Sequence, residues 1–136
     1  MIRTKCWNDS AEPDDGTRLL VCRYRPRALP KKDETWDLWW KQLGPSRELH
    51  AALYGKRGTP PSFADFKSRY LKEMADAEPK ALIRRLAEKH AAGETITLLC
   101  SSACVDPTQC HRTILQQLIE AEAATITGCG NDVPPP

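Results

Sequence analysis

The residues best suited to chemistry lie between Leu98 and Arg112, where a short apolar run leads through a polar segment to Cys110-His111-Arg112. The start of a helix carries free N–H groups and a partial positive charge, so a helix beginning here would bind an anion. Arg112 adds a fork of donors that fits phosphate or carboxylate. A cysteine at such a place has a lowered pKa, which makes Cys110 a candidate catalytic nucleophile, with Cys100 as a second candidate and His111 as the base.

A purely structural interpretation stands beside this one. Cys110 could be a small residue near a helix cap, His111 a solvated side chain, and Arg112 the partner of a nearby carboxylate. We expect anion binding at this segment and leave catalysis open.

Cysteine spacing excludes two loop chemistries and argues against a third. Phosphatase-like and rhodanese-like loops follow a Cys-x5-Arg pattern, whereas Cys104 and Cys100 precede Arg112 in Cys-x7-Arg and Cys-x11-Arg patterns. Zinc is disfavoured because no Cys-x2-Cys pair is present and because the adjacent residues Cys110 and His111 should point apart. We therefore predict no metal and no cofactor, and interpret Cys104 as an incidental loop residue. A Cys104–Cys110 redox pair stays open.

A second group of candidate residues follows the apolar run that ends at Cys22. Arg23, Arg25 and Arg27 alternate with other residues, so an extended backbone would place them on one side. At least one of the three should pair with a carboxylate on a neighbouring element. The predicted ligand-binding residues are Arg23, Arg25, Arg112, Cys22 and Ser101.

Aromatic residues gather near these arginines. Interleaved aromatic and arginine side chains can stack nucleic-acid bases, although such a stripe more often packs in a core. Because Trp36, Trp39 and Trp40 cannot all face one way on a helix, we expect at least one to be exposed, at the rim of a pocket or in a homodimer contact. Tyr24 adds a fourth ring nearby.

Composition places the chain among ordinary globular domains. It has 136 residues, 40% of them hydrophobic and 28% charged, and a net charge of +2, which does not indicate a dedicated nucleic-acid binder. No apolar run is long enough to span a membrane, and Met1–Lys5 lacks the core of a signal peptide. We expect a cytoplasmic protein with no membrane partner, whose six cysteines form no structural disulfides.

The pattern of apolar runs predicts an α/β fold. Segments 2–7, 17–22 and 95–100 are typical of strands, and the last two should be central and parallel. Helices are expected over 36–43 and 47–54, after Ser62, from Pro79, and from Cys110 or a neighbour. This predicts one domain over 1–124, with a small, mainly parallel sheet flanked by helices in three layers, and a frayed or disordered tail over 125–136. Ligands bind at the carboxyl ends of parallel strands, so segments 23–29 and 101–112 should share one edge.

Several motifs in order resemble one known family. Segments 11–21, 23–27 and 36–46, then 66–70 and the strand before Cys110-His111-Arg112, are similar to the YeaO-like branch of the domain-of-unknown-function 488 family. The resemblance implies a small α/β domain and supplies no agreed activity. Cys22 stands where members often carry Asp, Ala28 where they often carry Gly, and Ser102 where they often carry Glu. The two absent acids weigh against general acid–base catalysis.

The leading hypothesis is an anionic, phosphate-bearing ligand such as a nucleotide, bound at the carboxyl edge of the sheet, with cysteine-based catalysis as an extension. Two alternatives remain at this point. One is a nucleic-acid-binding module without catalysis, and the other is a metal- or haem-binding sensor built on the cysteines.

Overall fold

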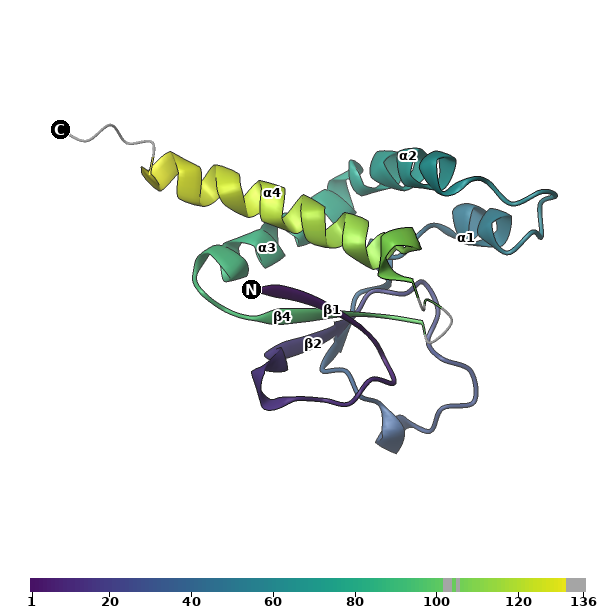
Figure 1. Cartoon of the computed structure of the whole chain (residues 1–136), viewed down its shortest axis with the longest axis horizontal. Coiled ribbons are helices and arrows are strands. Elements are labelled where there is room, and N and C mark those ends of the chain that lie inside the picture. The colour runs from purple at the N-terminus through teal and green to yellow at the C-terminus, as the bar shows by residue number, and fades with distance from the viewer. Residues whose placement is uncertain (102–103, 105, 132–136) are drawn as a thin grey trace.

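Four parallel strands form one sheet in the order β1-β4-β2-β3, as Figure 1 shows in part. The strands of this computed structural model, which describes residues 1–101, 104 and 106–131, are β1 (Ile2–Cys6), β2 (Thr17–Leu20), β3 (Leu38–Trp39) and β4 (Ile96–Cys100). Every strand pairing is parallel. The predicted α/β class with a parallel sheet is therefore confirmed.

Four α-helices accompany the sheet: α1 (Arg47–Leu53), α2 (Phe63–Met74), α3 (Ala77–Ala91) and α4 (His111–Asn131). Ser46 and Ser62 cap α1 and α2, because each side-chain oxygen accepts the N–H of the third residue of its helix. α3 begins two residues before Pro79. α4 continues to Asn131, into the segment where a tail was expected, and the division of the chain after residue 124 stays a prediction.

The sheet is the middle of three layers. The α-helices lie on one side of it (Figure 1) and share the core with side chains from β1, β2 and β4. The other face is covered by irregular segments with the 3-10 helices η1 (Pro13–Asp15) and η2 (Lys31–Asp33); two more, η3 (Lys41–Leu43) and η4 (Pro107–Gln109), precede α1 and α4. The core residues of the strands are Ile2, Leu19, Ile96 and Leu98, which pack with Tyr70, Leu86, Ile114, Leu115 and Ile119.

Charged groups hold the irregular layer to the sheet. Asp15, only 1% exposed, accepts from Arg18 Nη1 at 2.5 Å and lies 2.9 Å from Lys5 Nζ. Arg18 Nε also donates to the carbonyl of Thr35 at 2.7 Å, and its Nη2 to that of Trp7 at 3.4 Å. These contacts hold η1 and two loops against β2. The loops thereby cover this face of the sheet in place of a helix.

The helix predicted over 36–43 is wrong. Leu38 and Trp39 form the edge strand β3 beside β2, and only Lys41–Leu43 make a short 3-10 turn. The N–H of Asp37 donates to the carbonyl of Arg18, and that of Trp40 to the carbonyl of Leu20. The helical spacing of the tryptophans misled because aromatic residues also favour strands, and pairing with a buried neighbour decided the outcome.

The sheet brings two predicted loops to one edge. β2 and β4 are parallel neighbours, and Val21 N donates to the carbonyl of Leu99 beyond the last residue of β2. The residues that follow β2 and those that follow β4 consequently leave from the same edge, as was predicted for segments 23–29 and 101–112. Within the described part of the chain, no helix is both long and apolar enough to cross a membrane.

Candidate functional site

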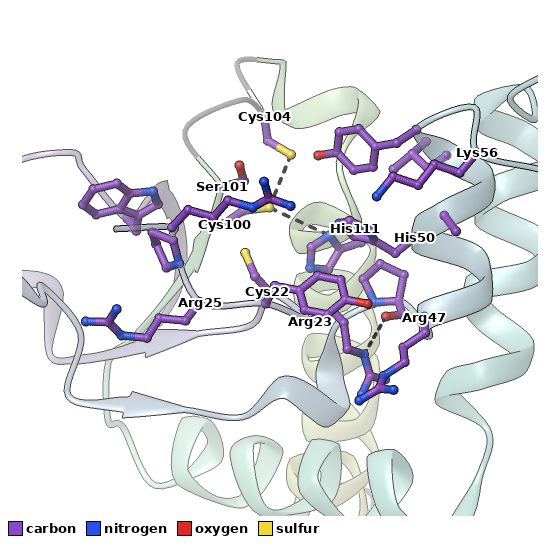
Figure 2. A pocket seen from close by; sticks show the side chains of 18 residues that line it. Cys22, Arg23, Arg25, Arg47, His50, Lys56, Cys100, Ser101, Cys104 and His111 are labelled. Carbon is purple, nitrogen blue, oxygen red and sulfur yellow. Dashed lines mark hydrogen bonds between the residues drawn. The ribbon is translucent and has the colours of Figure 1, made fainter. Parts of the chain in front are cut away.

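A cavity of about 880 Å³ lies at the carboxyl ends of β2 and β4, where α1 forms its opposite wall. In Figure 2 the sulfurs of Cys22, Cys100 and Cys104 lie between Arg25 on one side and His50 and Lys56 on the other. The lining residues fall into four chemical groups. They are the basic Arg23, Arg25, Arg27, Arg47 and Lys56; the rings Trp7, Tyr24, His50, Tyr54 and His111; the thiols Cys22, Cys100 and Cys104; and Pro26, Pro45, Ala51, Leu53 and Ser101.

The cavity is strongly basic. Five lining side chains are Arg or Lys, and none of the described residues that line it is Asp or Glu. Burial lowers the pKa of His50, and the positive charges of Lys56 and Arg23 lower it further. The lowered pKa of His50 is therefore consistent with a positive electrostatic potential in this cavity.

Two of the arginines are held in place by neighbours. Arg23 Nε donates to the carbonyl of Pro45 at 3.0 Å. Arg25 Nε donates to Glu34 at 2.6 Å, and its guanidinium lies 5.7 Å from the ring centroid of Trp36. Arg25 is thus an arginine paired with a carboxylate, as was expected for at least one of the three.

Helix α1 supplies a wall that the sequence analysis missed. Arg47, His50 and Tyr54 lie three and four residues apart, so they share one helix face. The carboxylate of Glu73 accepts the N–H of Ser46 at 2.7 Å, which fixes the start of α1 against α2. The spacing of these three residues was the signal that could have identified the wall.

Aromatic rings line the same wall. The ring centroids of Tyr24 and His50 are 4.9 Å apart, and those of His50 and Tyr54 are 4.6 Å apart. Tyr24 and Tyr54 are about half exposed, so their faces remain open to a ligand. Trp39 is the exposed member of the predicted tryptophan stripe, and its Nε1 donates to the carbonyl of Cys22 at 2.8 Å.

Three thiols meet at the floor of the cavity. Cys100 Sγ lies 3.4 Å from Cys104 Sγ and 3.3 Å from Cys110 Sγ. All three sulfur atoms lie within 4.8 Å of one another. The interpretation of Cys104 as an incidental loop residue is wrong, because the backbone turn from Ser101 to Cys104 brings its sulfur back onto β4.

The thiols differ in proton affinity. Hydrogen bonds donated by Cys100 and Cys110 lower the pKa of Cys104, and His111 and Arg112 lower it further. The hydrogen bond between Cys100 and Cys104 raises the pKa of Cys100. The hydrogen bond with Cys110 and burial raise the pKa of Cys100 further. Of these two thiols, the half-buried Cys104 therefore loses its proton more readily.

His111 and Arg112 are buried rather than open to solvent. His111 Nε2 lies 2.9 Å from the carbonyl oxygen of Val21, and its Nδ1 lies 3.8 Å from Cys100 Sγ. Arg112, 5% exposed, donates to Cys6 Sγ and to the carbonyl of Cys104, both at 3.3 Å. Arg112, which was predicted to bind the ligand, is not among the residues that line the cavity.

The other predicted residues divide between the cavity and its surroundings. Cys22, Arg23, Arg25, Ser101 and Cys100 line it. Cys110 is 2% exposed and lies behind Cys100, which leaves Cys104 as the more accessible thiol. Ser102 falls outside the described residues.

Comparison with known proteins places the chain in a family. A family model described as the active DUF488-N3 subclade matches residues 2–123. The uncharacterized protein YeaO of Escherichia coli (strain K12) is 38% identical over 114 residues, covering 84% of this chain and 92% of YeaO. The uncharacterized protein Rv3073c of Mycobacterium tuberculosis (strain H37Rv) is 31% identical over 111 residues, covering 82% and 86%. No solved structure matches the chain. The chain belongs to the DUF488 family.

Proposed function

We propose that this domain binds a phosphate-bearing small molecule of nucleotide size in the basic cavity. The carrying observation is the charge of the lining, which among the described residues has five basic side chains, one of them paired with Glu34, and no carboxylate. Arg and Lys in a concave site pair with phosphate oxygens through charge-assisted hydrogen bonds. Arg27, Arg47 and Lys56 have no carboxylate within 4.0 Å among the described residues, so their charges are available to a ligand.

Shape and aromatic content favour a nucleotide over inorganic phosphate. A volume of about 880 Å³ is at the upper end of the usual range for small-molecule sites. The half-exposed rings of Tyr24 and Tyr54 flank His50 and offer faces on which a base can stack. A concave site of this kind suits a small molecule better than an extended nucleic-acid backbone.

Thiols rather than carboxylates face the bound ligand. Cys22, Cys100 and Cys104 lie at the cavity floor, and the family model that matches is described as active. These features support thiol-dependent chemistry on the ligand, with Cys104 as the group that reaches it. Carboxylate-dependent acid–base chemistry has no candidate among the lining residues.

Isothermal titration calorimetry on the full chain tests the binding proposal. We expect AMP to bind more tightly than adenosine, and Arg47→Ala and Lys56→Ala each to weaken AMP binding about tenfold, which corresponds to about 1.4 kcal/mol. Arg84→Ala is the matched control, because Arg84 pairs with Glu88 on α3, away from the cavity. Equal binding of AMP and adenosine, or equal loss in the control, would contradict the proposal.

The salt dependence of oligonucleotide binding distinguishes the proposed small-molecule site from a nucleic-acid-binding module. Single-stranded oligonucleotides should bind no more tightly than AMP if the cavity is the site. Tight oligonucleotide binding that weakens steeply with salt, together with no detectable AMP binding, would instead indicate a nucleic-acid-binding module.

A further inference from the structure

The cysteine cluster at the cavity floor has the dimensions of a metal site. Sulfur ligands around a tetrahedral zinc ion lie about 3.7 Å apart, since each Zn–S bond is about 2.3 Å. Cys100 Sγ is 3.4 Å from Cys104 Sγ and 3.3 Å from Cys110 Sγ, and the three sulfurs lie within 4.8 Å of one another. Small side-chain rotations would suffice to surround an ion.

Local backbone structure explains how an unusual spacing makes this cluster. Asp106 caps η4, and Thr113 Oγ1 donates to the carbonyl of Pro107 at 2.5 Å, which ties η4 to the first turn of α4. Cys110 lies between them with extended backbone angles, φ −131° and ψ 144°. Its side chain is thereby turned toward β4, although no Cys-x2-Cys pair exists in the segment.

The surroundings are those that a thiolate site requires. Three thiolates and one zinc ion carry a net charge of −1. The buried guanidinium of Arg112, which donates to the carbonyl of Cys104, places a positive charge beside the cluster to balance it. His111 Nε2 donates to the carbonyl of Val21, which holds the imidazole beside Cys100 without making it a ligand.

We propose that Cys100, Cys104 and Cys110 bind a zinc ion, with its fourth coordination position facing the basic cavity. Thiolate sulfur is a preferred ligand of zinc, and three protein ligands with an open position are typical of catalytic rather than structural zinc sites. The open side follows from placement, because Cys100 and Cys104 line the cavity and Cys110 lies behind them. The proposal rests on the cluster alone and does not depend on anion binding.

Cobalt spectroscopy of the reduced full chain tests the site, because Co²⁺ reports thiolate ligands and tetrahedral geometry. We expect one equivalent of Co²⁺ to give intense sulfur-to-cobalt charge-transfer and tetrahedral d–d bands, which Zn²⁺ then abolishes. Cys104→Ser and Cys110→Ser should weaken Co²⁺ binding at least about a hundredfold, as expected when a direct ligand is replaced. Cys129→Ser, near the C-terminal end of α4, is the control and should bind Co²⁺ as the parent chain does.

A second readout covers the variants that fail to fold. In the parent chain, zinc should protect Cys104, the accessible thiol of the cluster, from a thiol-specific reagent. Equal reactivity of all thiols with and without zinc, or the absence of tetrahedral cobalt bands, would overturn the proposal. If the parent chain gives the cobalt spectrum but does not bind AMP, the result would count against the proposed function only.

Discussion

His111 Nε2 lies 2.9 Å from the carbonyl oxygen of Val21, ninety residues earlier in the chain. A carbonyl oxygen can only accept, so Nε2 carries the proton and Nδ1 presents its lone pair to Cys100. The ring of Tyr70 packs edge-on against the imidazole, with centroids 5.5 Å apart. This single bond therefore joins the end of β2 to the start of α4 and orients the imidazole toward the thiols.

Replacing this histidine should destabilise the fold. His111→Ala leaves the buried carbonyl of Val21 without its partner and opens a cavity beside Tyr70, so we expect a loss of about 2–3 kcal/mol in the free energy of unfolding. Urea denaturation followed by circular dichroism measures it. Gln117→Ala, at an exposed position on α4, should change stability by less than about 0.5 kcal/mol. An equal effect of both substitutions would contradict the assigned role of His111.

Much of the fold could be predicted because its strands are apolar runs. Segment 95–100 matches β4 to within one residue, and the two serine caps mark α1 and α2 correctly. The β3 edge strand could not be predicted, because its pairing with β2 depends on backbone contacts between residues 19 or 20 apart in the sequence.

Only part of the candidate site was predicted from the sequence. The basic segment after β2 follows from alternation and from the sheet-edge rule, so Arg23 and Arg25 were found. The thiol cluster was missed, because spacing rules assume short loops around a metal and cannot describe how η4 turns Cys110 back onto β4. Helix α1 itself was predicted, but its role as a wall of the cavity was missed, because the spacing of Arg47, His50 and Tyr54 shows a shared face and not what that face meets.

Asp15 should be the main source of acid sensitivity under the sheet. Asp15→Asn leaves Arg18 buried without its counter-charge, and removing one partner of such a pair costs about 3 kcal/mol or more. Urea denaturation at neutral pH measures the loss. Asp65→Asn, at an exposed position in the first turn of α2, is the control and should cost less than about 1 kcal/mol.

The pH dependence of that difference has a definite sign. Burial raises the pKa of Asp15, but hydrogen bonds from Lys5, the Glu12 N–H and Arg18 outweigh it and lower the pKa from 3.8 to about 2. The stabilisation is complete above the unfolded value of 3.8 and is lost as the pH falls through about 2. The stability gap between the parent chain and Asp15→Asn should therefore be constant above about pH 5 and narrow toward pH 2. A gap that widens on acidification would refute this assignment.

Replacing Ala28 with glycine should stabilise the fold. Its φ is +57°, in the left-handed region where a Cβ costs about 1–2 kcal/mol. Glycine removes that strain but adds freedom to the unfolded chain, so Ala28→Gly should stabilise by about 0.5 kcal/mol. Ala81→Gly on the exposed side of α3 is the matched control and should destabilise by about 1 kcal/mol. Thermal denaturation of both variants should show shifts of opposite direction, and a loss at both sites would contradict the strain argument.

Gly44 should tolerate no side chain, because two backbone segments pass closely there. A Cβ at this position would lie 2.5 Å from the backbone nitrogen of Arg23 and 2.9 Å from the carbonyl carbon of Cys22. Backbone atoms at the end of a central strand cannot yield as a flexible side chain would, so Gly44→Ala should destabilise by about 1–3 kcal/mol. The same shift would move Pro45, whose carbonyl holds Arg23, so AMP affinity should fall together with stability. Denaturation and calorimetry on the same preparation check both effects, with Ser68→Ala on the exposed side of α2 as the control. Unchanged stability of Gly44→Ala would mean that the strand end and the following turn can separate.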